Sequence, residues 1–254
     1  MKKNPFISRV LLALAAVTMA FGGAQADPMR FESGETRVAL LELFTSEGCS
    51  SCPSAERSLS ALTTHPSLWK MFVPVAFHVN YWDYLGWKDR LASPEFTQRQ
   101  HTYASLWKSD TVYTPEFVLN GREWHWSGGD TFARESKEAP GALTVSRNGP
   151  AENFVVTFRP TKPITGQATA HVALLGFGVT SDVARGENAG RKLTHDFVVL
   201  VHHQSPLQGS PLRAEFKPDE KGDAPHPRAL AAWVSLGNDP TPVQATGGWF
   251  SQAR

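Results

Sequence analysis

Two nearly continuous hydrophobic runs dominate the first half of the chain. Residues 37–44 (Arg-Val-Ala-Leu-Leu-Glu-Leu-Phe) and residues 71–79 (Met-Phe-Val-Pro-Val-Ala-Phe-His-Val) are apolar at almost every position. Such runs are typical of strands that are buried on both faces of a sheet. Between them, Ala55, Leu59 and Leu62 recur at helical spacing, and Pro53 suits the first turn of a helix. The pattern therefore predicts a strand, a helix and a second strand.

A second helix and a hairpin are predicted next. Ser93 is a typical helix cap, Pro94 suits the first helical position, and the apolar face of this helix extends from Phe96 to Trp107. Residues 112–124 then contain two short strands around an Asn-Gly pair, which is a strong turn signal.

The pattern changes after residue 140. Short β-prone runs are separated there by Gly, Pro, Asn and Asp, which indicates an all-β unit with a sandwich-like arrangement. These runs are residues 142–146, 153–159, 168–176, 193–202, 212–216 and 229–236. We therefore expect two domains after the leader, in residues 27–140 and 141–254.

Residues 1–26 have the features of a secretory signal peptide. Three basic residues precede an apolar run of about 12 residues, and Ala24-Gln25-Ala26 suits signal peptidase. The run is shorter than the roughly 20 residues of a membrane-spanning helix, although an uncleaved anchor is the alternative. We expect a periplasmic or secreted protein with no membrane anchor after cleavage.

Composition narrows the class of protein further. The 254 residues are 41% hydrophobic, which excludes a disordered polyelectrolyte and a protein with many membrane spans. Without the three basic residues of the leader, 22 basic residues face 24 acidic ones. This near balance makes nucleic acid an unexpected partner.

Cys49 and Cys52 are the only cysteines in the sequence. A disulfide between them closes a very small loop and adds little stability, so redox chemistry or metal binding explains the pair better. The pair lies where a predicted strand meets a predicted helix, and a helix N-terminus favours a thiolate. We expect Cys49 to attack a substrate disulfide and Cys52 to resolve the mixed disulfide.

Glu42 is the one carboxylate inside the first apolar run. A buried carboxylate is costly unless it is paired, neutral or useful. One interpretation makes Glu42 the proton acceptor for Cys52, as a third catalytic residue beside the two cysteines. The other pairs it with a Lys or Arg at the edge of the sheet.

The order of strand, C-x-x-C, helix, strand, inserted helix and Thr114-Pro115 resembles the thioredoxin superfamily. More closely, residues 42–53, 78–88, 93–96 and 186–191 resemble a family of secreted thioredoxin-like proteins of unassigned function. The resemblance implies an α/β thioredoxin-like domain with a helical insertion, followed here by the smaller all-β domain. It also implies a cis Pro115 beside the dithiol, with Thr114 and Pro115 in contact with substrate.

Trp82 belongs to a group of five tryptophans within residues 82–126. Exposed aromatic side chains could hold an unfolded or peptide substrate, whereas the alternative is a satellite core of the insertion. We place Trp82 among the substrate-binding candidates.

Three functions remain open. The first is an exported thiol–disulfide oxidoreductase that exchanges disulfides with protein or peptide thiols and needs an unknown redox partner. The second is a periplasmic protein that binds copper(I) or another soft metal through the two cysteines, and the third is a non-catalytic binding protein. We expect no cofactor, and no metal site from His195, His202 and His203, because their spacing in an extended strand separates them.

Overall fold

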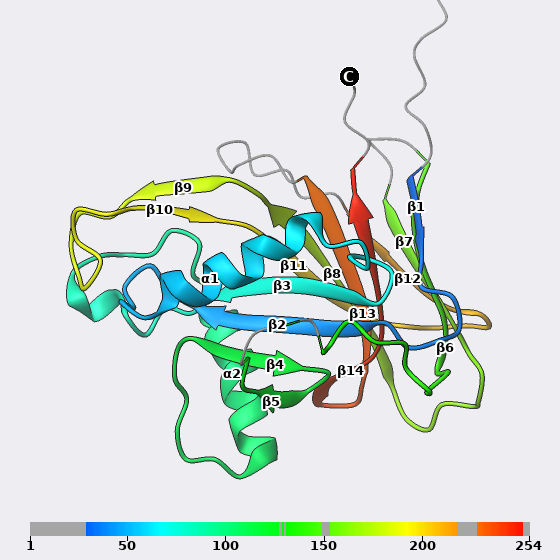
Figure 1. Ribbon diagram of the computed structural model, residues 1–254. Coiled ribbons are helices and arrows are strands. Elements are labelled where there is room, and N and C mark those ends of the chain that lie inside the picture. Colours follow the sequence, from blue (N-terminus) through cyan, green and yellow to red (C-terminus); the bar gives the residue numbers. More distant parts are fainter. Residues whose placement is uncertain (1–28, 127–128, 130, 149–152, 218–227, 251–254) are drawn as a thin grey trace, which may run out of the picture.

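The computed structural model describes residues 29–126, 129, 131–148, 153–217 and 228–250 (Figure 1). The predicted signal peptide, residues 1–26, lies outside these ranges. Within them, none of the helices has the length and apolar character needed to cross a membrane.

An eight-stranded mixed sheet forms the centre of the described structure. Its inner strands β2 and β3 are parallel to each other and buried along their whole length, in agreement with the two apolar runs. The order across the sheet is β14 (Asp239–Trp249), β13 (Ala229–Leu236), β8 (Ala168–Gly176), β11 (Val198–Pro206), β3 (Phe72–His78), β2 (Ala39–Thr45), β4 (Glu116–Leu119) and β5 (Arg122–Trp124).

Two smaller sheets accompany it. The four-stranded sheet has the order β1 (Met29–Glu32), β6 (Gly141–Arg147), β7 (Phe154–Pro160) and β12 (Leu212–Phe216). The two-stranded sheet pairs β9 (Val179–Asp182) with β10 (Lys192–His195) in antiparallel fashion. In Figure 1 this β9–β10 hairpin extends toward the end of the large sheet at which α1 begins.

Alternation along β13 shows how the layers pack. Ala231 and Trp233 belong to one hydrophobic core, whereas Leu230 and Ala232 belong to a second core shared with the four-stranded sheet. Successive side chains of a strand point to opposite faces, so β13 contributes to a core on each side. The four-stranded sheet therefore covers part of one face of the large sheet.

The two α-helices of the described residues lie on opposite faces of β2. Glu42 and Phe44 of β2 contact Tyr103 of α2 (Pro94–Trp107), whereas Thr45 donates a hydrogen bond to Glu56 of α1 (Cys52–Ser60). Positions 42 and 45 face opposite sides of a strand. Short 3₁₀ helices occur at Ala61–Thr64 and Asp83–Leu85.

The turn between β4 and β5 follows the predicted Asn-Gly signal. Asn120 and Gly121 both have positive φ, at 50° and 79°. A two-residue hairpin turn of this kind needs the left-handed region at both positions. A Cβ on residue 121 would also lie 2.4 Å from Thr241 Oγ1, so glycine is needed there for two reasons.

The expected fold class, an α/β thioredoxin-like domain with a helical insertion followed by a smaller all-β domain, is wrong. The described residues are mainly β structure, and the large sheet contains strands from both sides of residue 140. The physical reason lies at β3: Ala76 pairs in parallel with Val198 of β11, and the Ala76 N–H donates to Phe197 O at 2.9 Å. The later strands extend the first sheet. The domain boundary at residues 140 and 141 stays a prediction.

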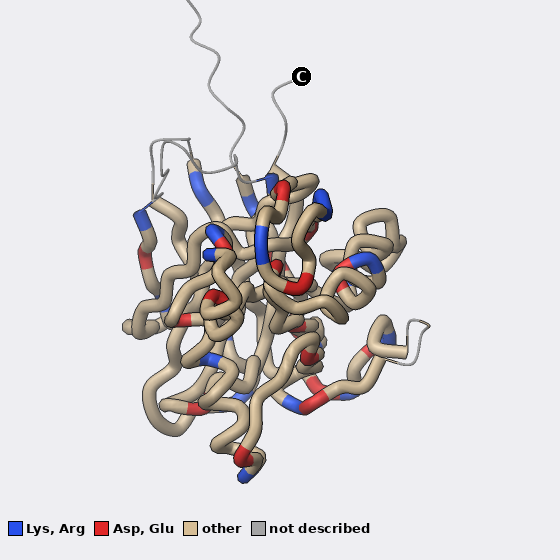
Figure 2. Tube along the Cα trace, turned by 90° about the vertical axis from the view of Figure 1, so that its left-hand side faces the viewer, with Lys and Arg blue, Asp and Glu red and all other residues tan. Residues whose placement is uncertain are grey.

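Basic and acidic residues are interspersed along the chain (Figure 2). This distribution agrees with the near-balanced charge of the sequence. Contacts between individual side chains therefore identify the candidate site.

Candidate redox site

Cys49 and Cys52 form a disulfide at the junction between β2 and α1. The helix begins at Cys52, so Cys49 lies three residues ahead of the first turn, as predicted. Both cysteines are buried, with 1% and 0% of their surfaces exposed. The Cys49 N–H donates to Ser46 O, which shapes the turn before the helix.

Thr114, Pro115 and Trp82 are the three residues predicted to contact substrate, and they lie near Cys49. The Thr114–Pro115 bond is cis, and the Thr114 carbonyl oxygen is 3.6 Å from Cys49 Sγ. Trp82 Nε1 donates to Thr114 Oγ1 at 2.8 Å. A Cβ on Gly48 would lie 2.7 Å from Trp82 Cβ, so the Trp82 backbone and the dithiol loop are in close contact.

A cavity of about 370 Å³ adjoins this loop. Ser54 of α1 and Pro115 line it together with the aromatic residues Tyr113, Trp124 and Trp126. Trp124 and Trp126 also pack against the main core. Trp124 and Trp126 thus fit both interpretations of the tryptophan group, since they support the core and line a cavity.

The loop of the β9–β10 hairpin packs against the dithiol loop. Asn188, which is fully buried, donates from Nδ2 to the carbonyl oxygens of Glu47 and Cys49 at 2.9 Å each. Arg191 donates to Asn188 Oδ1 at 2.6 Å and holds the amide in place. Glu187 accepts a hydrogen bond from the Ser50 N–H. Residues 186–191 therefore fix the backbone that carries the disulfide.

Glu42 points away from the helix of the dithiol. Its carboxylate accepts hydrogen bonds from Arg99 Nε and Tyr103 Oη, both at 2.6 Å and both on α2. Arg99 is 8% exposed and its charge is paired with Glu42. The pairing with an arginine agrees with the ion-pair interpretation, although Glu42 is fully buried in an inner strand and not at the edge of the sheet. Glu42 lies on the face opposite α1, which argues against a role as proton acceptor for Cys52.

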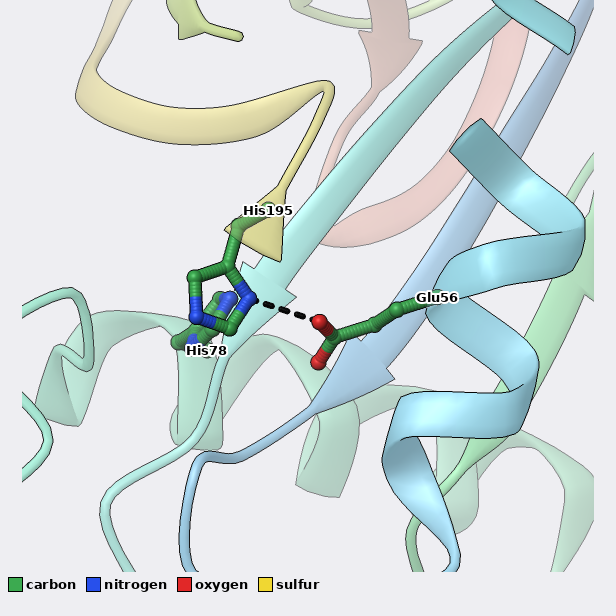
Figure 3. A group of neighbouring side chains, drawn as sticks. All are labelled: Glu56, His78 and His195. Atoms are coloured by element: carbon green, nitrogen blue, oxygen red, sulfur yellow. Dashed lines mark hydrogen bonds and ion pairs between the residues drawn. The ribbon is translucent and has the colours of Figure 1, made fainter. Parts of the chain in front are cut away.

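A cluster of buried ionisable residues lies on the α1 side of the sheet (Figure 3). Glu56 follows Cys52 by one helical turn, His78 ends β3, and His195 ends β10. Atoms of these three side chains that can bind a metal lie within 4.8 Å of one another. Glu47 Oε1 lies 3.3 Å from His195 Nε2, and Asp89 accepts a hydrogen bond from His78.

Burial and hydrogen bonding compete within this cluster. Burial favours neutral His195, but its hydrogen bonds to Glu47 and Glu56 outweigh burial and raise its pKa to about 10. Burial likewise favours neutral Asp89, yet the charge and hydrogen bond of His78 bring the pKa of Asp89 below its usual value. The sequence did not reveal this cluster, because its members come from three separate segments.

A second, larger cavity of about 580 Å³ lies on the α2 side of the sheet. A chain of hydrogen bonds along its wall joins Ser235, His171, His202 and Glu95. Burial lowers the pKa values of both histidines. This series of hydrogen bonds therefore contains two neutral imidazoles and ends at the carboxylate of Glu95. It lies on the opposite side of the sheet from α1.

Comparison with known proteins supports the fold. The model of the family described as "Protein of unknown function (DUF1223)" matches residues 40–235. A crystal structure of a structural-genomics target from Agrobacterium tumefaciens is similar, with 24% identity and a TM-score of 0.62 over 86% of this chain and 97% of the other. HBP35 of Porphyromonas gingivalis has 15% identity and a TM-score of 0.58 over 87% of this chain and 78% of the other. No curated protein matches the chain.

Proposed function

This chain belongs to the DUF1223 family of proteins of unknown function, and we propose from its site that it is a thiol–disulfide oxidoreductase. The observation that carries the proposal is the Cys49–Cys52 disulfide at the N-terminus of α1, with Cys49 Sγ 3.6 Å from Thr114 O beside an aromatic cavity.

The proposed reaction moves two electrons between the dithiol and a substrate. In the reducing direction, the Cys49 thiolate attacks a substrate disulfide, forms a mixed disulfide and releases one substrate thiolate. The Cys52 thiolate then attacks Cys49 Sγ, which restores the Cys49–Cys52 bond and releases the second substrate thiolate. In the oxidising direction the same steps run backward, and the substrate dithiol becomes a disulfide.

The environment of Cys49 supports its role as the attacking residue. It precedes α1, whose unpaired N–H groups carry partial positive charge and favour a thiolate. The cavity lined by Ser54, Pro115 and Trp124 offers a peptide both polar and aromatic surface beside α1 and the cis proline. The substrates we propose are protein or peptide thiols and disulfides, in the periplasm or outside the cell, with a separate redox partner that recycles the dithiol.

The test measures exchange between the protein and a fluorescent disulfide peptide. We expect the reduced parent protein to reduce the peptide, Cys49→Ser to abolish the reaction, and Cys52→Ser to accumulate a mixed disulfide visible by mass spectrometry. Ser105→Ala, at an exposed position of α2, is a matched control that leaves both thiols in place. A parent protein that folds and binds copper(I) tightly but exchanges no disulfide would replace this proposal with the soft-metal alternative.

A further inference from the structure

We propose that His78, His195 and Glu56 form a binding site for one zinc-like divalent cation. The three side chains come from β3, β10 and α1 and turn toward one another (Figure 3). Their candidate ligand atoms lie within 4.8 Å of one another, and each side chain is buried. The site uses neither cysteine, so it is independent of the proposed redox function.

The hydrogen bonds of His78 prepare its second ring nitrogen to bind a cation. Nδ1 donates to Asp89 Oδ2 at 2.7 Å, and Asp89 is itself fixed by the backbone N–H groups of Glu47 and Leu91. In the neutral tautomer that donates from Nδ1, the lone pair of Nε2 is free. Nε2 is buried and has no hydrogen-bond partner. Metal-binding histidines typically have such a carboxylate behind the ring.

Glu56 and Glu47 each direct one carboxylate oxygen toward His195 and the other toward a different hydrogen-bond donor. Glu56 Oε1 accepts from Thr45 Oγ1 at 2.5 Å, and Oε2 faces His195 Nδ1 at 2.6 Å. Glu47 Oε2 accepts from Trp87 Nε1 at 2.6 Å. Glu47 Oε1 lies 3.3 Å from His195 Nε2, so Glu47 pairs with the second ring nitrogen of His195 as Asp89 pairs with Nδ1 of His78.

An unpartnered buried polar atom is costly, and His78 Nε2 is such an atom within this cluster. A bound cation would satisfy it. A ligating imidazole is neutral, so the cation would displace the proton between His195 Nδ1 and Glu56.

The donor set selects the class of metal. Imidazole nitrogen with carboxylate oxygen suits zinc and neighbouring divalent transition metals, whereas calcium prefers six to eight oxygens and copper(I) prefers thiolate. All three ligands are buried, and the site joins α1, β3 and β10. Such a site would stabilise the fold around the dithiol.

The experiment uses the full-length protein as purified, with Cys49–Cys52 oxidised and metals removed by chelation. Titration with Zn²⁺ against a competing chelator should show one ion per chain. His78→Ala and His195→Ala should each weaken Zn²⁺ binding at least tenfold, and Asp89→Asn should weaken it by about tenfold through His78. The exposed His101 of α2 provides a matched control, and His101→Ala should leave the affinity unchanged.

Spectroscopy and stability provide independent readouts. Co²⁺ bound to the oxidised protein should give visible d–d bands without a thiolate charge-transfer band, and a Cys49→Ser/Cys52→Ser double variant should give the same spectrum. Zn²⁺ should raise the Tm of the parent protein and not that of His78→Ala. Circular dichroism establishes that each variant is folded.

Three results would overturn the proposal: no stoichiometric Zn²⁺ binding to the folded oxidised protein, unchanged affinity in both histidine variants, or loss of binding in the double cysteine variant. If the histidine variants do not fold, Glu56→Gln decides, because it keeps the shape of the side chain and removes a charged ligand. Unchanged Zn²⁺ affinity in folded Glu56→Gln would overturn the proposal, and at least a tenfold loss would support it. None of these outcomes depends on disulfide exchange activity.

Discussion

At the scale of single residues, a buried charged side chain can determine the stability of the fold, and Glu42 is the clearest case. Its ion pair with Arg99 lies between β2 and α2, and the Arg99 guanidinium also packs within 5.5 Å of the ring centres of Phe77, Tyr103 and Trp233. Removing one partner of a buried pair leaves the other charge uncompensated.

We therefore expect Glu42→Gln to lower the free energy of unfolding by about 3 kcal/mol, because Arg99 loses its counter-charge. Urea denaturation measures this loss. Tyr103→Phe is the comparison that keeps the ion pair: it removes the hydrogen bonds of Tyr103 Oη with Glu42, Arg99 and Pro240 and should cost about 1 to 2 kcal/mol. Disulfide exchange should change less than twofold in Glu42→Gln. If Glu42→Gln is stable but resolves the mixed disulfide slowly, Glu42 acts as the proton acceptor for Cys52.

Glu116, which follows Pro115, provides a prediction about pH. Burial raises the pKa of Glu116 to about 7, although a hydrogen bond from Gln100 Nε2 partly opposes the shift. The folded state therefore binds this proton more tightly than the unfolded state does. Its contribution to stability is fully present below pH 4.5 and is lost as pH rises toward 7.

The measurement compares the parent protein with Glu116→Gln, which cannot ionise. The parent should lose about 1 to 3 kcal/mol relative to the variant between pH 5 and pH 8. Urea unfolding at several pH values gives both curves. Parallel curves over this range would show that Glu116 does not titrate as the structure implies.

At the residue scale the sequence identified which residues are unusual, but not their partners. Glu42 was recognisable as a carboxylate within an apolar run, and both cysteines were recognisable from their spacing. The partner of Glu42 is Arg99 on α2, and the sequence does not show which face of β2 this helix covers. The cluster of Glu56, His78 and His195 was missed for the same reason: contacts between distant segments depend on the fold.

At the scale of elements, local signals gave accurate results. The helix predicted from Ser93 and Pro94 is α2, and Ser93 Oγ accepts a hydrogen bond from the Glu95 N–H. The β9–β10 hairpin shows the limit of such signals. Its loop, residues 186–191, resembles a known family in sequence, but its contact with the dithiol depends on packing.

The hairpin loop yields a prediction about access to the disulfide. Asn188→Ala removes two hydrogen bonds and leaves the carbonyl oxygens of Glu47 and Cys49 without these donors. We expect a loss of about 1 to 3 kcal/mol in stability and faster reduction of Cys49–Cys52 by dithiothreitol, because the loop no longer fixes its backbone.

Stopped-flow reduction monitored by tryptophan fluorescence measures this rate, since Trp82 lies beside the dithiol loop. The exposed Lys192 of β10 supplies the control, and Lys192→Ala should reduce at the parent rate. An Asn188→Ala protein that is destabilised but reduced no faster would show that the loop does not control access.

At the scale of the whole molecule, the sequence failed because sheet pairing is non-local. Five of the six β-prone runs after residue 140 correspond to single strands, whereas residues 193–202 span β10 and the start of β11, and β9 and β14 were not predicted. Nothing in the composition of these runs shows that β11 pairs with β3. The consequence is an eight-stranded sheet in which β3 is an inner strand between β2 and β11. Other contacts cross the same boundary: Gln244 Oε1 accepts from the Val38 N–H at 2.8 Å, and Pro240 O accepts from Tyr103 Oη at 3.1 Å.

These contacts predict how a fragment of residues 27–140 should behave. Without β11 the fragment would expose the edge of β3, and without β14 it would lose partners of Val38 and Tyr103. Unpaired strand edges also promote association between chains. We expect the fragment to lack a cooperative urea transition and to form soluble oligomers or aggregates, whereas residues 27–254 should unfold in a cooperative transition. Circular dichroism with size-exclusion chromatography distinguishes the two. A monomeric fragment that unfolds cooperatively would restore the division into two domains, with the shared sheet as an interface between them.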